Sequence, residues 1–145
     1  PEVKKMCCVL KLFSGTVNIG RAFERLGWCV ISIDIDPRWK PTFAVNISEC
    51  DYTVFPRDSF QFVWASPVCT QYSKARTTGG PRDLEGADRL VSRALEISKK
   101  LSSAAWAFEN PQAGLLTTRA IVQGLPFVDT SYCRDAYAYR KNTRI

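Results

Sequence analysis

Short apolar runs separated by polar and amphipathic stretches recur along the whole chain. Six of these runs have the length and composition of β-strands. They cover residues 8–13, 29–33, 43–47, 62–65, 105–109 and 127–132. The pattern therefore predicts six short strands, with helices or loops between them.

Two of the intervening stretches have the periodicity of amphipathic helices. In residues 18–26 the apolar side chains share one face, and Gly27 is placed to end the helix. Residues 83–101 have the clearest pattern, and Asp83 is placed to support their first turn. Residues 115–122 predict a further short helix.

Strands that alternate with helices indicate the fold class. This order predicts right-handed crossovers and an α/β fold with a mostly parallel sheet that carries helices on both faces. The length of 145 residues suits one domain with its own core, so we expect residues 1–145 to form a single domain. Ligands bind beyond the carboxyl ends of the strands in such sheets, so residues that follow a strand are candidates for a site.

The composition narrows the classes of function. Hydrophobic residues make up 46% of the chain and charged residues 23%, and no apolar run is long enough to span a bilayer. We therefore expect an intracellular protein without membrane contact. The net charge of +6 favours a polyanionic partner such as DNA or RNA.

The chain contains no histidine, which excludes Ser-His-Asp triads, Cys-His pairs, histidine-bound zinc and histidine general bases. Its six cysteines are scattered and lack C-x-x-C spacing, so we predict no metal site and no zinc deaminase site. Several cysteines lie in apolar runs. We expect reduced, buried thiols rather than disulfides.

Cys69 and Glu109 are the residues that suggest chemistry. Each follows an apolar run, and a thiol with a carboxylate can attack and protonate an electron-poor ring. Residues 74–82, rich in Lys, Arg, Thr and Gly, predict a mobile basic loop just downstream, and positive charge favours a thiolate. Two other interpretations stay open: Cys69 as a structural thiol, and Glu109 with Asn110 as a helix N-cap signal.

Two further segments follow strands and suggest a nucleotide-like ligand. Phe13, Ser14, Gly15 and Thr16 form a turn in which glycine lets the backbone approach a ligand. Asp34 ends the second strand about 20 residues later, the spacing at which an acidic side chain binds ribose hydroxyls. Together the two segments favour an adenosyl ligand. The alternatives are an ordinary strand-to-helix turn and a turn cap by Asp34 or Asp36.

These segments occur in the order found in one protein family. Residues 12–15 (LFSG), 34–36 (DID), 66–69 (SPVC), 109–111 (ENP) and 140–144 (RKNTR) together resemble the cytosine-C5 DNA methyltransferases, particularly their short phage-type members. The resemblance covers nearly the whole chain. It implies a class I, Rossmann-like methyltransferase fold that uses S-adenosylmethionine.

The resemblance also assigns roles. Cys69 matches the nucleophile that attacks C6 of cytosine, Glu109 the residue that contacts N3 and the amino group, and Arg144 a late arginine that steadies the activated base. The implied mechanism is base flipping, covalent attack, methyl transfer to C5 and elimination. The implied cofactor-binding positions are Phe13, Ser14, Gly15, Thr16, Asp34, Ile35, Asn46, Ser66 and Pro67.

Six positions depart from the family pattern, concentrated where ligand contact is implied: Lys11, Val17, Asn46, Gln61, Val68 and Asn142. Lys11 occupies the position of an acidic residue in the family pattern. Val17 occupies the position of a glycine, and the valine side chain would crowd the methionine moiety. Asn46 stands for an aspartate near the adenine amino group. We expect these three to weaken cofactor binding. The family's target-recognition region and its final segment are not visible in the chain.

The departures leave two hypotheses. The first is a DNA cytosine-C5 methyltransferase that works alone or is completed by a partner. The second is a degenerate, non-catalytic methyltransferase fold with a binding or structural role in a larger assembly that contains nucleic acid. The candidates for binding DNA or RNA are Ser73, Lys74, Arg76, Arg82, Arg140 and Lys141. The segments that carry them could equally be solvated surface or face a protein.

Overall fold

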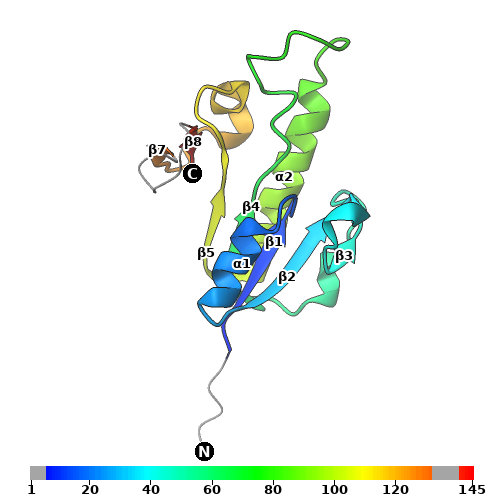
Figure 1. Ribbon diagram of the computed structural model, residues 1–145, viewed down its shortest axis with the longest axis vertical. Coiled ribbons are helices and arrows are strands. Elements are labelled where there is room, and N and C mark those ends of the chain that lie inside the picture. Colours follow the sequence, from blue (N-terminus) through cyan, green and yellow to red (C-terminus); the bar gives the residue numbers. More distant parts are fainter. Residues whose placement is uncertain (1–5, 132–140) are drawn as a thin grey trace, which may run out of the picture. The chain divides into compact units, whose positions relative to one another are not determined.

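The first five predicted strands form one sheet in the computed structural model, which describes residues 6–131 and 141–145 (Figure 1). The order of the strands is β3-β2-β1-β4-β5. Their bounds are β1 (Cys8–Leu12), β2 (Cys29–Asp34), β3 (Phe43–Ala44), β4 (Phe60–Ala65) and β5 (Ser102–Phe108).

The central strand β1 pairs in parallel with β2 on one side and β4 on the other, and β2 pairs in parallel with β3. Parallel neighbours require the chain to cross back over the sheet after each strand, as the alternation of strands and helices predicts. Leu12 lies opposite Ile33 and Ala65. The carboxyl ends of β1, β2 and β4 therefore lie along one edge.

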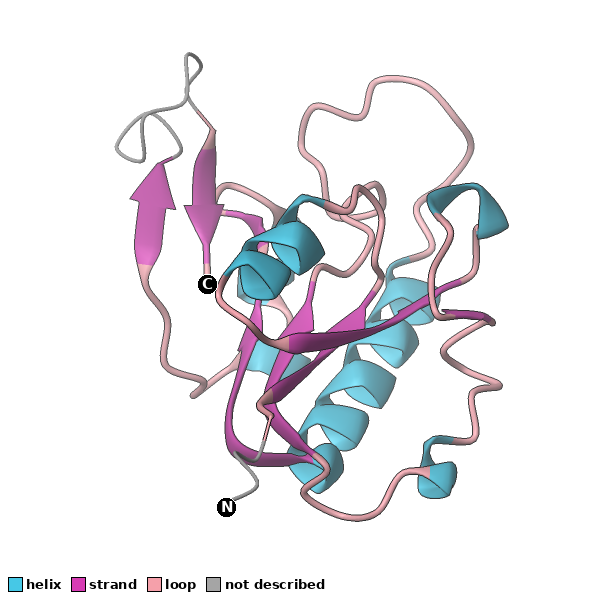
Figure 2. Cartoon of the chain, turned by 60° about the horizontal axis from the view of Figure 1, so that its bottom comes forward, coloured by secondary structure: helices cyan, strands magenta, loops and turns pink. Residues whose placement is uncertain are grey.

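Helix α1 (Asn18–Arg25) lies on one face of the sheet (Figure 2). The centres of the Phe23 ring and the Phe62 ring of β4 are 5.8 Å apart, and Gly20 packs against the Val30 side chain of β2. The helix ends where the sequence predicts, because Gly27 adopts a left-handed φ of +79°.

Helix α2 (Leu84–Leu101) lies on the opposite face (Figure 2). Asp83 caps it, since its carboxylate accepts the Gly86 N–H at 2.7 Å. The sheet residues of this face are almost fully buried: Leu10, Leu12, Ile33, Val63 and Ala65. Ala94, Leu95, Ile97 and Leu101 are the buried helix residues of the same half of the core. The parallel sheet with a helix on each face confirms the predicted fold class.

The chain divides into two units. The first unit, Pro1–Ala65 with Arg93–Ala107, holds the parallel sheet. The second unit, Ser66–Ser92 with Phe108–Ile145, holds a small sheet of order β6-β8-β7. Its strands pair antiparallel and are β6 (Asn110–Pro111), β7 (Asp129–Ser131) and β8 (Asn142–Arg144).

The predicted helix over residues 115–122 is wrong. This stretch forms two 3₁₀ turns, η3 (Leu115–Thr118) and η4 (Ala120–Val122), with Arg119 in an extended conformation between them. The hydroxyls of Thr117 and Thr118 each donate to a backbone carbonyl three residues back. Such local bonds compete with helix formation.

Two strand predictions also need correction. The third strand was expected to reach residue 47, but it ends at Ala44, and Asn46 begins a turn in which its carbonyl accepts the Glu49 N–H at 2.9 Å. The sixth strand, predicted over residues 127–132, is the three-residue β7 of the small sheet. Its partner β8 is short and mostly polar, so it has no periodic signal in the sequence.

The expectation of buried cysteines is wrong for the described residues. Cys7 is exposed, and Cys8, Cys29, Cys50 and Cys69 are half-buried free thiols. Cys8 and Cys29 are the first residues of β1 and β2, at the rim of the sheet rather than in its core. Burial raises the pKa of the Cys8 thiol, and the neighbouring Cys29 adds to this effect. Cys133 lies outside the described residues.

Candidate functional site

The turn after β1 is held to the end of β2. Phe13 and Gly15 both adopt left-handed conformations, with φ of 54° and 47°. The Ser14 N–H donates to the Ile33 carbonyl at 3.1 Å, and the Gly15 N–H donates to the Asp34 carboxylate at 2.7 Å. Two successive backbone amides therefore fix the predicted cofactor turn against the neighbouring strand.

Asp34 joins the turns after β1 and β2. Its second carboxylate oxygen accepts the Asp36 N–H at 2.8 Å, so the predicted turn-capping role is real. Each oxygen of an ionised carboxylate can accept more than one hydrogen bond. The capping role therefore leaves capacity for the ribose hydroxyls that the sequence analysis assigned to Asp34. The Ile35 side chain beside it is 68% exposed and offers an apolar surface.

Two of the departures from the family pattern lie at this turn. The buried Lys11 ammonium donates to the Thr16 carbonyl at 2.8 Å. Burial lowers the pKa of Lys11, an effect that the charge of Asp34 opposes. Val17 has an ordinary φ of −72° as the N-cap of α1, so the backbone at this position does not require glycine.

Asn46 is also held by the main chain. Its side-chain oxygen accepts the Ser48 N–H at 3.0 Å, which leaves the amide nitrogen as the group that could face a ligand. Another departure, Gln61, has a structural partner as well: its side-chain oxygen accepts the Cys8 N–H at 2.7 Å.

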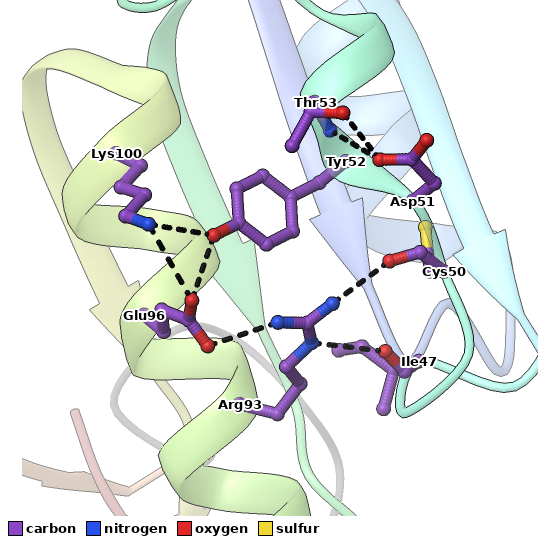
Figure 3. A network of polar contacts seen from close by, with 8 residues as sticks. All are labelled: Ile47, Cys50, Asp51, Tyr52, Thr53, Arg93, Glu96 and Lys100. Carbon is purple, nitrogen blue, oxygen red and sulfur yellow. Dashed lines mark hydrogen bonds and ion pairs between the residues drawn. The ribbon is translucent and has the colours of Figure 1, made fainter.

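A network of polar contacts on α2 holds the turn that Asn46 begins (Figure 3). The Arg93 guanidinium donates to the carbonyls of Ile47 and Cys50 at 3.5 and 3.0 Å. It also stacks 4.7 Å from the centre of the Tyr52 ring. Residues 47–50 are thereby fixed to the helix.

Glu96 closes the same network (Figure 3). It accepts the Tyr52 hydroxyl at 2.7 Å and the Arg93 guanidinium at 2.9 Å, and these donors hold the pKa of Glu96 below its usual value. The Lys100 ammonium donates to the Tyr52 oxygen at 2.9 Å. We call Tyr52, Arg93, Glu96 and Lys100 the Tyr52 network. The sequence analysis missed it, although arginine and glutamate three residues apart on a helix are a recognisable pair.

In the second unit, the segment that carries Cys69 is tied to the segment that follows Glu109. The Asn110 side chain donates to the Pro67 carbonyl at 3.0 Å, and the Leu115 N–H donates to the Tyr72 carbonyl at 2.8 Å. Residues 67–72 are thus held at both ends, with Cys69 between the two bonds. The structure therefore brings together the two segments that the sequence selected for chemistry.

Tyr72 anchors this loop from inside. It is fully buried, its N–H donates to the Cys69 carbonyl at 3.0 Å, and its hydroxyl donates to Asp88 of α2 at 2.8 Å. The other oxygen of Asp88 accepts two bonds from Arg119, at 2.8 and 2.6 Å. We call these three side chains the Tyr72 network. The sequence analysis missed it, and a tyrosine in an otherwise polar loop was the available signal.

The charges of the Tyr72 network are reflected in its pKa values. Burial, together with the hydrogen bond to Asp88, raises the pKa of Tyr72. Burial also raises the pKa of Asp88, but the bonds from Arg119 and Tyr72 outweigh it and bring the pKa below its usual value. The carboxylate and the phenol thus remain charged and neutral, respectively, around neutral pH.

Glu109 lies beside β8. Its carboxylate accepts the hydroxyl of the buried Thr143, and the Lys141 ammonium lies 3.3 Å away. Thr143 and Arg144 are consecutive in β8, so their side chains point to opposite faces of the small sheet. The structure therefore places Lys141 and Thr143, rather than Arg144, in contact with Glu109.

Arg144 has partners of its own. It forms a bidentate ion pair with Asp129, with N–O distances of 2.6 and 2.7 Å. Its guanidinium carbon lies 3.7 Å from the centre of the Phe127 ring. The hydrogen bonds from Arg144 lower the pKa of Asp129. The pair uses Nε and Nη2 of Arg144 and leaves Nη1 as the nitrogen that could donate to a base.

The basic loop over residues 74–82 has no helix or strand, and two of its arginines serve the loop itself. Arg76 donates to the Gln71 side chain at 2.7 Å and to the Gly80 carbonyl at 3.1 Å, and Arg82 donates to the Gln71 carbonyl at 2.8 Å. Lys74 is exposed.

The remaining predicted residues have these positions. Ser66 and Ser73 are half-buried, Pro67 is buried, Val68 is 57% exposed, and Asn142 is exposed in β8. Arg140 lies outside the described residues.

Two searches within residues 6–131 and 141–145 found no candidates. No helix there is both long and apolar enough to cross a membrane. No group of three or more Cys, Asp or Glu side chains there could hold a metal ion.

Solved structures with a similar fold are methyltransferases. The chain aligns with a methyltransferase from Entamoeba histolytica with a TM-score of 0.61 at 12% identity, over 97% of this chain and 52% of that one. A Burkholderia thailandensis 1,6-didemethyltoxoflavin-N1-methyltransferase, solved with S-adenosylhomocysteine bound, gives 0.54 at 12% identity, over 96% and 69% of the two chains. An Archaeoglobus fulgidus SAM-dependent methyltransferase gives 0.50 at 18% identity, over 74% and 46%.

These likenesses confirm the predicted methyltransferase fold, and the chain spans about half the length of the Entamoeba and Archaeoglobus proteins. No protein-family model matches the chain. Frog virus 3 (isolate Goorha) has a protein described as a probable DNA (cytosine-5)-methyltransferase that is 34% identical over 152 residues. The alignment covers 94% of this chain and 68% of the viral protein. On this identity and coverage, the chain belongs to the DNA (cytosine-5)-methyltransferase family.

Proposed function

We propose that the chain transfers a methyl group from S-adenosylmethionine to C5 of cytosine in DNA, through a covalent adduct with Cys69. The observation that carries this proposal is the pair of bonds from Asn110 to Pro67 and from Leu115 to Tyr72. These bonds hold the loop of the nucleophile against the segment of Glu109. Family membership supports this reaction, and the neighbour described as SAM-dependent supports the cofactor.

The residues of the first unit fit the adenosine part of the cofactor. Asp34 retains capacity to accept ribose hydroxyls, and the exposed Ile35 side chain suits one face of an adenine ring. The Asn46 amide nitrogen can donate to an adenine ring nitrogen. The ammonium of Lys11 would make the methionine end of the site more positive than in the family pattern. When bound, S-adenosylmethionine supplies an electrophilic methyl group.

The chain's own side chains then account for the chemistry at the base. The Cys69 thiolate forms a bond to C6, and the electron pair displaced from the C5–C6 bond makes C5 nucleophilic. Glu109 contacts N3 and the amino group. After C5 has gained the methyl group, its proton leaves to a base, the C5=C6 double bond re-forms and the C6–S bond breaks, which releases the Cys69 thiolate. Base flipping gives the thiol access to C6.

A second candidate is a non-catalytic methyltransferase-fold subunit with a binding or structural role, alone or in an assembly with nucleic acid. The observation that favours it is that the predicted catalytic side chains are already paired, Glu109 with Lys141 and Arg144 with Asp129. A base would have to use the Glu109 oxygen and the Arg144 nitrogen that these pairs leave, or displace Lys141 and Asp129. DNA, RNA and a protein partner remain possible ligands for this candidate.

Trapping with DNA that contains 5-fluorocytosine separates the two candidates. Fluorine replaces the C5 hydrogen that a base would have to remove, so elimination is blocked and an active chain should remain linked to the base after methyl transfer. Peptide mapping should find the adduct at Cys69. Cys69→Ser should abolish the adduct, whereas the matched change Cys29→Ser should retain it. A folded, cofactor-bound chain that gives no adduct would favour the non-catalytic candidate.

A further inference from the structure

Helix α2 carries two carboxylates with the same pattern of partners. Asp88 and Glu96 each accept a tyrosine hydroxyl from a loop that follows a strand, and each accepts an arginine guanidinium. Tyr52 is 7% exposed and Tyr72 is fully buried. Burying a phenol without a partner is costly, so each hydroxyl selects one position of its loop.

The Tyr52 network acts on the turn of Asn46. Arg93 donates to the carbonyls of Ile47 and Cys50, which lie one and four residues after Asn46 (Figure 3). The Cys50 carbonyl also accepts the Tyr52 N–H at 3.1 Å. These bonds set where residues 46–50 lie relative to α2, while the Asn46 side chain itself remains outside the network.

The Tyr72 network acts on the turn of Cys69. The Tyr72 backbone bonds the Cys69 carbonyl and the Leu115 N–H, and its side chain bonds Asp88. Asp88 in turn accepts hydrogen bonds from Nε and Nη2 of Arg119. One residue therefore connects the nucleophile's turn, the segment after Glu109, and the helix.

We propose that the two networks are separate positioning devices: the Tyr52 network sets the cofactor turn at Asn46, and the Tyr72 network sets the nucleophile turn at Cys69. The inference rests on the proposed function for the meaning of the two turns. It assigns positioning roles, rather than contact with the cofactor or the base, to the members of the two networks: Tyr52, Arg93, Glu96, Lys100, Tyr72, Asp88 and Arg119. The physical basis is that a tyrosine whose ring is buried and whose hydroxyl bonds a charged side chain fixes the position of its loop.

The test removes one hydroxyl at a time from the full chain. Tyr52→Phe and Tyr72→Phe make the same chemical change in the two networks. Two readouts are measured for both: the dissociation constant for S-adenosylhomocysteine by calorimetry, and the rate at which iodoacetamide alkylates Cys69, read by peptide mass spectrometry. Cys29 in the same sample is the internal reference for the alkylation rate.

The two variants should separate the readouts. Tyr52→Phe should raise the dissociation constant about tenfold, the loss of roughly one charged hydrogen bond, and leave Cys69 alkylation within about twofold. Tyr72→Phe should loosen the turn and speed Cys69 alkylation at least about threefold, with the dissociation constant within about twofold. Formation of the fluorocytosine adduct should slow about tenfold in Tyr72→Phe, opposite in sign to alkylation.

Other outcomes would overturn the inference. Equal changes of both readouts in both variants would indicate general destabilisation, and no change in either readout would remove the positioning roles. If Tyr72→Phe does not fold, Arg119→Met tests the same network from its outer end. Failure of the wild-type chain to form any adduct would contradict the proposed methyl transfer. The alkylation readout would still decide the role of Tyr72.

Discussion

The predicted cofactor residues Asp34, Lys11 and Asn46 of the first unit and the predicted catalytic residues Glu109 and Arg144 of the second form different kinds of bonds. Around the cofactor turns, side chains bond to the main chain: Asp34 to two backbone amides, Lys11 to a carbonyl and Asn46 to an amide. Glu109 and Arg144 instead bond other side chains, Glu109 with Lys141 and Thr143, and Arg144 with Asp129.

The departures from the family pattern lie mainly among the residues of the first unit. Four of the six departures lie in the first unit, at Lys11, Val17, Asn46 and Gln61. Three of them, Lys11, Asn46 and Gln61, bond a backbone group of their own surroundings. In the second unit, the paired residue whose loss would leave a fully buried partner is Asp88, the acceptor of the Tyr72 hydroxyl.

The largest effect that tests this comparison is expected at Asp88. Asp88→Ala leaves the buried Tyr72 hydroxyl and the Arg119 guanidinium without their acceptor, and should lower the free energy of unfolding by about 3 kcal/mol in urea denaturation. The matched change Asp51→Ala removes an exposed carboxylate that accepts the backbone N–H and the hydroxyl of Thr53, and should lower the free energy of unfolding much less. Equal decreases in the free energy of unfolding for Asp88→Ala and Asp51→Ala would contradict the difference between the two regions.

A change of opposite sign is expected at Lys11. The pKa of Lys11 is lower in the folded chain than in the unfolded chain. Protonation of Lys11 therefore favours the unfolded state. Wild-type stability should therefore rise with pH in the window that ends at the ordinary value of 10.5. Lys11→Met should raise stability by about 1 kcal/mol at neutral pH.

The pH dependence supplies the control for Lys11. The advantage of Lys11→Met should shrink as the pH rises toward 10.5, measured by urea denaturation at a series of pH values. A pH-independent advantage would mean that packing, rather than the buried charge, distinguishes the two side chains.

Asn46 offers a smaller test of the cofactor turns. Asn46→Asp keeps an oxygen for the Ser48 N–H and gives the ligand a second acceptor in place of a donor. Affinity for S-adenosylhomocysteine should improve about threefold, the value of a modest hydrogen bond to the adenine amino group. Calorimetry measures it, and unchanged or weaker binding would place the adenine elsewhere.

The smallest effect is expected in the basic loop. Lys74 is exposed, whereas Arg76 and Arg82 bond within the loop. If the chain binds DNA, its affinity should fall with salt concentration, and Lys74→Glu should make the plot of log affinity against log salt concentration less steep by about 1. Fluorescence anisotropy measures this slope. Arg76→Glu should in addition disturb the loop. A slope unaffected by Lys74→Glu would remove this loop from the nucleic-acid interface.

The sequence was sufficient to predict the parallel sheet, both helices and their capping residues. Each of these depends on local periodicity, and Gly27 and Asp83 act where the pattern places them. Residues 115–122 were predicted wrongly because two threonine hydroxyls bond the backbone that a helix would use. The small antiparallel sheet could not be predicted, since its strands are two or three residues long and pair residues far apart in the sequence.

For the site, the sequence selected the segments but could not give their partners. The motif order located Cys69, Glu109 and Arg144. The bonds of Glu109 to Lys141 and Thr143 depend on the register of β8, which no local pattern encodes. The tyrosine networks likewise depend on which loop folds onto α2.

Calorimetric titration of the folded chain with S-adenosylhomocysteine tests the central claim most directly. The fit of the turns after β1, β2 and β3 to an adenosyl ligand predicts saturable binding of one molecule per chain, weakened by Asp34→Ala because that carboxylate serves both the turn and the ribose. A chain that unfolds cooperatively in urea, and so is folded, yet gives no heat of binding would contradict the assignment as a S-adenosylmethionine-dependent methyltransferase and leave the non-catalytic candidate.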